Sequence, residues 1–581
     1  MKFIYIFSIL ILLLTTSCSN NFISNPLRNY KSPPDLLIHG GNILTMQGDT
    51  PNYVEALLIK DGYIQFAGNL DEAKKQSNKA TPSLDLKNQT LIPSFIDAHS
   101  HVTAIGLQEF TAKLYPPPDG SVSDIKTLIQ TMKYWSNKNQ KLINSMDGWI
   151  VGLGYDDSQL FEKRHPTAEE LDQISKSNPV FLLHQSGHIV ALNTKALELL
   201  KIDENTKDPD GGIIVRIQNS LKPNGILEEE AATEAKSHLL EHIPLMTKLK
   251  IPKIAFQKYI ENGFTTVQEG RANIDTTRLL KIYSKLNQLD IDVVVYPDII
   301  SSKEYMLKSG SSLNYDKHFR IGGVKISLDG SPQGKTAWLT KPYLIPPKGL
   351  SPDYLGYPAF PDSNKVQEAI NLAYQNNWQV IAHANGDAAI DQYLNAIEYA
   401  NKKFGENNRR NVIIHAQTIR DDQLDRAKEL GVIPSFFSAH TFYWGDWHKN
   451  ETLGLERASK ISPANSALNK GILFTQHHDA PIVPPSAIRV LDSTVNRKTR
   501  SGIILGENER VSPYIALKSL THWAAYQYSE EKYKGTLEKG KKADLVILDK
   551  NPLTIPKDQI INIKIVATYK NGRKLYPPNS N

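Results

Sequence analysis

The chain has 581 residues, of which 22% are charged and 40% are hydrophobic, a balance typical of globular proteins with a sizeable core. This length allows two to four domains, or one large barrel with additions. The formal net charge of +6 is small, and the sequence has no basic stripe with interleaved aromatic residues, which argues against nucleic acid as a partner.

The N-terminus has the pattern of an export signal. Lys2 supplies a positive charge, and residues 3–14 form an apolar core that is too short to span a bilayer permanently. Cys18, the single cysteine, follows Leu14-Thr-Thr-Ser and resembles the cleavage site of a bacterial lipoprotein, although Thr15 stands where leucine is usual. We therefore expect a signal peptide over 1–17, a lipid anchor on Cys18 and a tether over 18–34. Such a lipoprotein would be exported to the periplasmic side of the outer membrane or to the cell surface.

An ordinary signal peptide with an incidental cysteine is the alternative interpretation of this segment. In either case, no cysteine remains for disulfides or for thiolate metal ligands. Any metal site must therefore be built from His, Asp, Glu or Lys.

Short alternating strands with glycine turns occur at both ends of the mature chain. On the N-terminal side they begin at Asp35, Ala56 and Tyr63, and Asp61-Gly62 is a hairpin signal between the last two. The same pattern of short alternating strands occurs again at 543–549 and 563–572. We predict one small β-sandwich built from 35–90 and from the C-terminal part of 506–581.

The middle of the chain alternates buried-looking strands with helical stretches. Eight strands are predicted, at 91–98, 263–269, 292–297, 323–328, 379–382, 411–414, 432–437 and 472–475. Eight parallel strands with intervening helices is the count of a TIM (β/α)8 barrel, which would occupy 91–505 and end within 506–581. The long gap after the first strand predicts an inserted α+β region over about 110–250. An open doubly wound α/β sheet is the alternative.

The first barrel strand ends in His99-Ser-His101. Residues two apart on a strand point to the same side, so the two imidazoles can share one metal ion. Neutral imidazole is the commonest protein ligand for a transition metal. Two surface histidines on a strand edge would give the same pattern, so the motif needs support from later strands.

That support comes from polar residues at or near the carboxyl ends of later strands, where TIM barrels place their active sites. They are Lys325 in the fourth strand, His383 after the fifth, His415 after the sixth and Asp479 after the eighth. Each residue alone has an ordinary structural explanation. Six such residues in barrel register indicate a metal centre.

With these motifs the chain resembles the amidohydrolase superfamily, in particular the branch that contains N-substituted formamide deformylase and YtcJ-like proteins. The resemblance runs from about residue 35 to residue 576, and its strongest segments are 95–101, 323–330, 383–389 and 535–545. It implies metal binding by His99, His101, His383, His415 and Asp479. Asp479 would also exchange protons with the attacking water. Lys325 matches a lysine that several branches carbamylate so that it bridges two metals.

Some residues depart from the pattern of this branch or lie in its pocket-forming segments. The residues that differ from the common ones are Ser94, Ile414 and the pair His477-His478. Because of these differences, the resemblance does not identify the substrate. Gly154-Tyr-Asp-Asp157 is a weaker pocket candidate and is more typical of a turn. The predicted substrate contacts are His188 in the inserted region, His440 and Trp444 on an aromatic loop, and His478, for which packing or metal binding is an alternative role.

The sequence therefore predicts a hydrolase of carbon–nitrogen bonds other than peptide bonds, which acts on an amide, N-formyl or cyclic amide group of a small molecule. Hydroxide generated at a divalent metal would be the nucleophile. Zinc is favoured, as one ion, or as two if Lys325 is carbamylated. A lactone or ester hydrolase and a catalytically inactive ligand-binding lipoprotein are the alternatives. A homo-oligomer is compatible with the sequence.

Overall fold

The computed structural model describes residues 35–578. The predicted signal peptide over 1–17, the anchor at Cys18 and the tether over 18–34 lie outside these residues. Among the helices of residues 35–578, none combines the length and the apolar composition that crossing a bilayer requires.

The middle of the chain forms a ring of parallel strands. Two hydrogen-bonded sheets make up the ring, and they join at both seams. At one seam Gly322 N donates to Val295 O, and at the other His101 N donates to Ala480 O. The strands are, in ring order, β6 (Phe95–Ile96), β13 (Phe264–Ala272), β14 (Asp292–Pro297), β15 (Phe319–Ile321) continued by β16 (Gly323–Ser327), β17 (Gln379–Ala384), β18 (Val412–His415), β19 (Ile433–Phe436) and β20 (Thr475–Gln476). The predicted α/β barrel is confirmed.

Helices cover the outside of the ring and bury its apolar side chains in one large core. Each of the strands β13, β17 and β18 is followed by a helix that returns the chain to the start of the next strand. The covering helices are α10 (Ile251–Glu261), α11 (Ile274–Lys285), α12 (Lys303–Ser309), α13 (Ser363–Gln375), α14 (Asp387–Phe404), α15 (Asp421–Glu429), α18 (Ala464–Asn469), α19 (Ala487–Asn496), α20 (Pro513–Leu520) and α21 (His522–Gln527).

The predicted first barrel strand, 91–98, is divided between two sheets. Its first half is β5 (Thr90–Pro93), which pairs with β1 and β21 of a separate sheet, and only Phe95 and Ile96 belong to the barrel. The switch occurs at Ser94, whose N–H donates to Asp544 O, while the next N–H, of Phe95, donates to Gly263 O. Both halves are fully buried, so a continuous apolar run does not reveal the change of partner.

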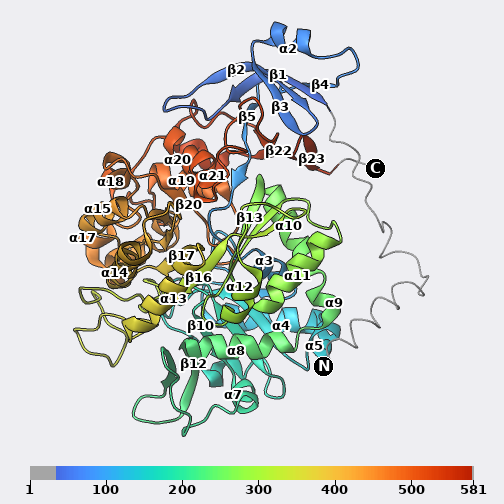
Figure 1. Cartoon of the computed structure of the whole chain (residues 1–581). Helices are drawn as coiled ribbons and strands as arrows, with labels where there is room; N and C mark the ends of the chain where they lie inside the picture. Colours follow the sequence, from blue (N-terminus) through green and yellow to red (C-terminus); the bar gives the residue numbers. More distant parts are fainter. Residues whose placement is uncertain (1–34, 579–581) are drawn as a thin grey trace.

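The two ends of the chain build one eight-stranded sheet above the barrel (Figure 1). The sheet curls, since Ile64 N on β3 donates to Lys541 O just before β21. Asp61 and Gly62 both have positive φ in the β2–β3 hairpin, as the predicted turn requires. The strands are β1 (Leu36–Leu44), β2 (Tyr53–Lys60), β3 (Tyr63–Gly68), β4 (Ser83–Asp85), β5, β21 (Leu545–Leu548), β22 (Ile565–Lys570) and β23 (Arg573–Tyr576), with α2 (Leu70–Gln76) beside them. We call this the end sheet.

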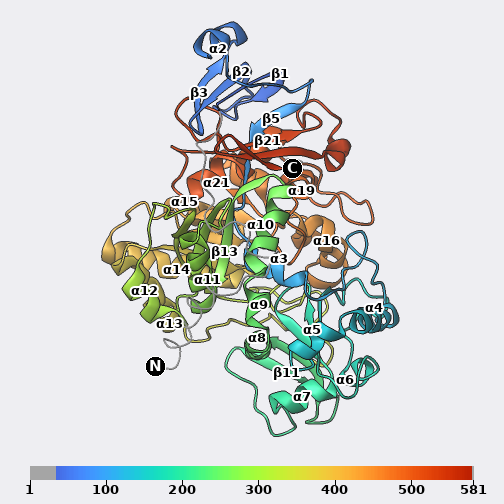
Figure 2. The same ribbon diagram turned by 90° about the vertical axis from the view of Figure 1, so that its right-hand side faces the viewer.

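The segment between β6 and α10 forms a second sheet with its own helices, which we call the inserted region. It lies at the opposite end of the molecule from the end sheet, as Figure 2 shows. Alternate strand residues pack against α4 (Ile125–Lys138) on one face and against α8 (Glu230–Glu241) on the other. The strands are, in sheet order, β11 (Gly212–Arg216), β12 (Pro223–Glu229), β10 (Ile189–Leu192), β9 (Val180–His184), β8 (Ile150–Tyr155) and β7 (Ala112–Lys113).

Candidate metal centre

Three predicted ligands meet at the carboxyl end of the barrel. His99 Nε2 lies 3.4 Å and His101 Nε2 lies 3.6 Å from the same oxygen, Asp479 Oδ1. One ligand atom from each of the three residues falls within 4.8 Å of the others, which is close enough for one ion. The structure therefore brings together side chains that follow β6 and β20, the first and last strands of the ring.

The other predicted residues lie around these three. His415 Nε2 is 3.9 Å from Asp479 Oδ2, and the rings of His383 and His415 are 4.6 Å apart. Lys325 Nζ, on β16, is 3.3 Å from His99 Nε2. All six predicted residues thus occupy one cluster, which we call the metal-end cluster.

The backbone at the metal-end cluster is strained at two of its members. His415 has φ 74° and Asp479 has φ 53°, although a side chain with Cβ disfavours this left-handed region. Such strain is concentrated at functional sites, where the surrounding structure holds it. In addition, Gly270 on β13 has no Cβ, and a Cβ there would come within 2.4 Å of His99 Cε1. Glycine at this position allows the His99 ring to approach the strand.

Burial controls the charge of the metal-end cluster. Desolvation lowers the pKa of His101 to about 3 and holds the pKa of His99 and His415 well below the ordinary value. Neutral imidazole, with a free lone pair, is the form that binds metal. Burial also lowers the pKa of Lys325 to about 7 and raises that of Asp479 to about 8, because each ionised form loses its water.

Neighbouring groups orient the histidine ligands. Gln268 Oε1 lies 2.5 Å from His99 Nδ1, which leaves Nε2 to face Asp479. His415 Nδ1 is 3.1 Å from His477 Nε2, and His477 Nδ1 is in turn 3.0 Å from Ser435 Oγ. Partners of this kind fix the tautomer and the orientation of metal-binding histidines. Gln268 and Ser435 were not predicted from the sequence, since an amide and a hydroxyl in buried strands carry no local motif.

The cluster fits a divalent cation. Asp479 Oδ1 is buried and has no hydrogen-bond partner, although two imidazole nitrogens face it. His383 Nδ1 is also buried without a hydrogen bond, at 3.2 Å from Asp329 Oδ1 but with unsuitable geometry. Orphaned buried acceptors of this kind are rare in proteins, and a bound ion is one way to satisfy them. Imidazole nitrogens and one carboxylate suit zinc, iron and manganese.

The structure distributes the four predicted substrate contacts unevenly. His188 and His440 line a small cavity beside the cluster, together with Gln333 and Asn385. His188 Nδ1 is held by Glu229 Oε2 at 2.7 Å, which leaves Nε2 for the cavity. Trp444 does not line this cavity. It lies one layer behind, with its ring 4.5 Å from that of His440 and its indole N–H on Asp156.

His478 does not lie at the cavity either. Its ring packs 5.6 Å from Tyr259 and 5.2 Å from Phe264, and its Nε2 is 3.5 Å from Asp97 Oδ1. The predicted substrate contact is therefore corrected to a packing position. His477 and His478 continue the extended backbone of β20 and so point to opposite sides, His477 toward the cluster and His478 toward the packed interior behind β6. The left-handed backbone at Asp479 then directs its side chain to the cluster.

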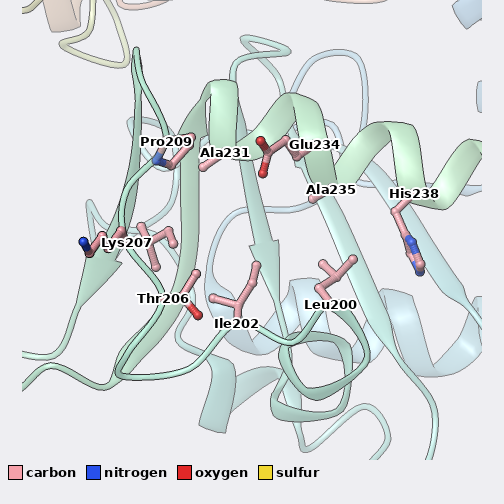
Figure 3. A pocket seen from close by; sticks show the side chains of 10 residues that line it. Leu200, Ile202, Thr206, Lys207, Pro209, Ala231, Glu234, Ala235 and His238 are labelled. Atoms are coloured by element: carbon pink, nitrogen blue, oxygen red, sulfur yellow. The ribbon is translucent and has the colours of Figure 1, made fainter.

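A larger cavity, of about 400 Å³, lies in the inserted region and contains none of the metal-end residues (Figure 3). It is open to solvent between α8 and the loop that follows α7 (Thr194–Leu200). Apolar side chains such as Leu200 and Ile202 line it, with Lys207, Glu234 and His238 among its polar residues. Because none of the ligand set faces it, the chemistry is assigned to the small cavity.

Comparison with known proteins gives a consistent result. A model described as the amidohydrolase family matches residues 83–576. The YtcJ protein of Bacillus subtilis is 27% identical, with 93% of this chain and 98% of that protein covered. N-substituted formamide deformylase of Arthrobacter pascens is 24% identical, with 93% and 97% covered. Among solved structures, an uncharacterized metal-dependent hydrolase of Pyrococcus horikoshii superimposes with a TM-score of 0.71 at 26% identity, with 90% of this chain and 99% of that chain covered.

Proposed function

Because the chain belongs to the amidohydrolase family, we propose that it hydrolyses a non-peptide carbon–nitrogen bond in a small molecule. The observation that carries this proposal is the orphaned Asp479 Oδ1, which faces two neutral imidazoles at the carboxyl end of a barrel. A carboxylate in that position can both bind a cation and exchange protons with a water beside it. Structural relatives with the same fold are named metal-dependent hydrolases.

The proposed cofactor is a divalent cation, with zinc as the first candidate. His99, His101, His383, His415 and Asp479 would hold one ion, and a carbamylated Lys325 would be needed for two. When bound, such a cation lowers the pKa of water and polarises a carbonyl group.

The chain's own residues would supply the proton transfers and the orientation of the substrate. Asp479 would accept the proton of the attacking water and return it to the departing amine, which is the role of a general base followed by a general acid. His188, held at Nδ1 by Glu229, and His440, held at Nδ1 by His448, would direct their remaining ring nitrogens at the substrate carbonyl oxygen.

An N-formyl or other small acyl group is the substrate feature that we propose first. The cavity beside His383 and His415 has about 10 Å³ of free space, which is close to the volume needed for one water. One relative of similar length is named for the deformylation of N-substituted formamides.

A substrate panel tests the proposal. Purified protein, stripped by a chelator and reloaded with Zn²⁺, would be assayed against N-formyl amines, cyclic amides, lactones and esters. We expect turnover of N-formyl amines that is lost on chelation and restored by zinc. Turnover of lactones or esters alone would replace the proposed bond type. A protein that neither retains metal nor hydrolyses any member would instead support an inactive ligand-binding barrel.

We also propose that Cys18 carries a lipid anchor, because it follows a short apolar segment of the kind found before lipoprotein cleavage sites. In a bacterial host, the wild-type protein should be recovered with membranes. The variant Cys18→Ser should move to the soluble fraction with its activity unchanged. An unchanged membrane fraction for this variant would contradict the anchor.

A further inference from the structure

A second group of histidine and aspartate side chains lies in the inserted region. β8 and β9 are adjacent parallel strands, so their carboxyl ends meet at one edge of the sheet. Asp156 and Asp157 follow β8, and His184 is the last residue of β9. The loop that continues from Asp157 returns His165 to the same edge. We propose that Asp157, His165 and His184 form a second divalent-metal site, separate from the metal-end cluster.

The ligand atoms converge without help from the metal-end residues. His184 Nε2 lies 3.0 Å from Asp157 Oδ1, and His165 Nε2 lies 3.9 Å from Asp157 Oδ2. One ligand atom from each residue falls within 4.8 Å of the other two. Asp156 adds a fourth oxygen, since its Oδ1 is 3.6 Å from His184 Nε2.

These spacings suit a tetrahedral ion. Ligands at about 2.0–2.2 Å from a tetrahedral zinc lie roughly 3.3–3.6 Å from one another. The contacts at 3.0, 3.6 and 3.9 Å lie on both sides of that range, so small side-chain movements suffice. Two imidazoles and two carboxylates form a set that suits zinc and related divalent cations.

The outer ring nitrogens of both histidines are already held. His165 Nδ1 is 3.2 Å from the Tyr155 hydroxyl, and His184 Nδ1 is 2.9 Å from Ser186 Oγ. In metal sites, the ring nitrogen that does not bind the ion usually donates to such an oxygen. Both imidazoles therefore present Nε2 to the carboxylates, in the orientation that a ligand requires.

In the metal-free fold the carboxylates are balanced by histidine: burial would lower the pKa of His184, but Asp156 and Asp157 outweigh it and raise that pKa to about 9, so a bound cation would take the place of a proton. Of the described residues, no lysine or arginine forms an ion pair with Asp156 or Asp157, and Lys335 acts on Asp157 only at longer range. Asp157 is also well shielded, with 15% of its side chain exposed. Two adjacent carboxylates repel each other in such surroundings, so a cation between them and the imidazoles would be stabilised.

The metal-free arrangement shows which proton would move. Ser186 N–H points at His184 Nδ1 at 3.0 Å, so Nδ1 accepts and the ring proton lies on Nε2, shared with Asp157. On metal binding Nε2 would lose its proton to water, so that its lone pair can bind the ion. Nδ1 would then carry the ring proton, which requires Ser186 Oγ, 2.9 Å away, rather than the Ser186 N–H to face it.

The site would stiffen one wall of the small cavity. Ser186 and His188, which line that cavity, follow His184 directly. On the other side, Asp156 accepts the indole N–H of Trp444, whose ring packs at a tilt against the cavity residue His440. A cation at Asp157 would therefore tie the inserted region to α16 (His440–Trp447) across the cavity.

The test counts zinc ions in the full-length protein. A blocked variant, His99→Ala/His101→Ala/Asp479→Asn, removes three ligands of the metal-end cluster. After chelation, incubation with Zn²⁺ and desalting, mass spectrometry of metals should find about one zinc per chain in this variant. Adding His165→Ala to it should remove that zinc, whereas adding His238→Ala, a change to another histidine of the inserted region, should not.

Two further measurements guard against misfolding and give a signal from the site itself. His165→Gln replaces the ring by an amide of similar polarity, so loss of zinc with an unchanged circular dichroism spectrum supports the site. Co²⁺ added to the blocked variant should quench the emission of Trp444, and Trp444→Phe should abolish that quenching. A blocked variant that binds no zinc, or one whose zinc survives His165→Ala, would overturn the proposal.

Discussion

Each end of the barrel contains a buried aspartate and buried lysine. At one end these groups form ion pairs, and at the other end they do not. At the end nearest the end sheet, Asp292, the first residue of β14, lies 2.6 Å from both Lys534 Nζ and Lys570 Nζ and accepts from His318 Nδ1 at 2.6 Å. We call this group the sheet-end cluster. In the metal-end cluster, Asp479 Oδ1 has no hydrogen-bond partner, and Lys325 has no carboxylate within ion-pair distance among the described residues.

The electrostatic outcome follows from that difference. Burial alone would raise the pKa of Asp292, but Lys534 and Lys570 outweigh it and hold the pKa well below its usual value. Burial raises the pKa of Asp479 to about 8 and lowers that of Lys325 to about 7. The sheet-end charges neutralise each other and stabilise the fold. The metal-end charges lack such compensation, and a bound cation would supply it.

The first prediction concerns a substitution in the metal-end cluster alone. Asp479→Asn should reduce kcat/KM by about 10³-fold or more, which corresponds to about 4 kcal/mol of transition-state stabilisation. In chelated protein the unfolding midpoint in urea should not fall, because the Asp479 carboxylate, whose pKa burial raises to about 8, has no positive partner among the described residues to lose. Kinetics on the best substrate and urea unfolding measure the two effects. Comparable activity in this variant would remove the aspartate from its proposed role.

The second prediction concerns a substitution in the sheet-end cluster alone. Asp292→Asn leaves the ammonium groups of Lys534 and Lys570 buried without their shared carboxylate, and removing one partner of a buried pair typically costs about 3–5 kcal/mol. We expect a loss of that size in the free energy of unfolding, with the activity of the folded fraction retained. Asp275→Asn is the matched control, since 93% of that side chain is exposed. It should change stability by less than about 0.5 kcal/mol.

The third prediction compares the two lysines directly. Lys534→Met should lower the free energy of unfolding by about 3 kcal/mol, because Asp292 and Glu530 lose a partner that lies 2.6–2.7 Å from each. Lys325→Met should change it by less than about 1 kcal/mol, since an apolar side chain of similar length avoids the cost of burying an ammonium group. Equal losses for both variants would contradict the contrast between the two ends.

Much of the metal-end cluster could be predicted from the sequence because strand geometry is local. Apolar runs that end in His99, His383 and His415 identify the strands, and parallel strands place their carboxyl ends together. Since His477 and His478 continue β20, alternation predicts that they face opposite sides, although it does not say which of them faces the cluster.

Other features depend on contacts that no local pattern encodes. The division of 91–98 at Ser94 follows from hydrogen bonds to Asp544 and Gly263, which are far away in the sequence. The sheet-end cluster joins β14 to C-terminal residues that are distant in the sequence. From the sequence alone, its lysines are therefore interpreted as ordinary surface charges. Asp157 was best interpreted as a turn residue, because its partners His165 and His184 follow 8 and 27 positions later.

The fourth prediction concerns the smallest effect, which is the pH dependence of the stability that Asp292 contributes in the sheet-end cluster. The pKa of Asp292 is lower in the folded than in the unfolded chain, where it is about 3.9. Its stabilising contribution is therefore complete above about pH 5 and declines as the pH falls toward the folded value. The difference in unfolding free energy between the wild type and Asp292→Asn should be constant from about pH 5 to 7 and shrink below about pH 4.

Asp479 in the metal-end cluster gives the control, because its pKa is shifted in the opposite direction to that of Asp292. The pKa of Asp479 is raised to about 8 in the metal-free fold, so ionisation is harder in the folded than in the unfolded chain. In chelated protein, the stability of the wild type relative to Asp479→Asn should therefore decrease as the pH rises from about 4 toward 8. Zinc should suppress that decrease, since the cation stabilises the ionised carboxylate. If both pairs of proteins showed the same pH trend, the two aspartates would share one electrostatic environment, and the contrast between the two ends of the barrel would be wrong.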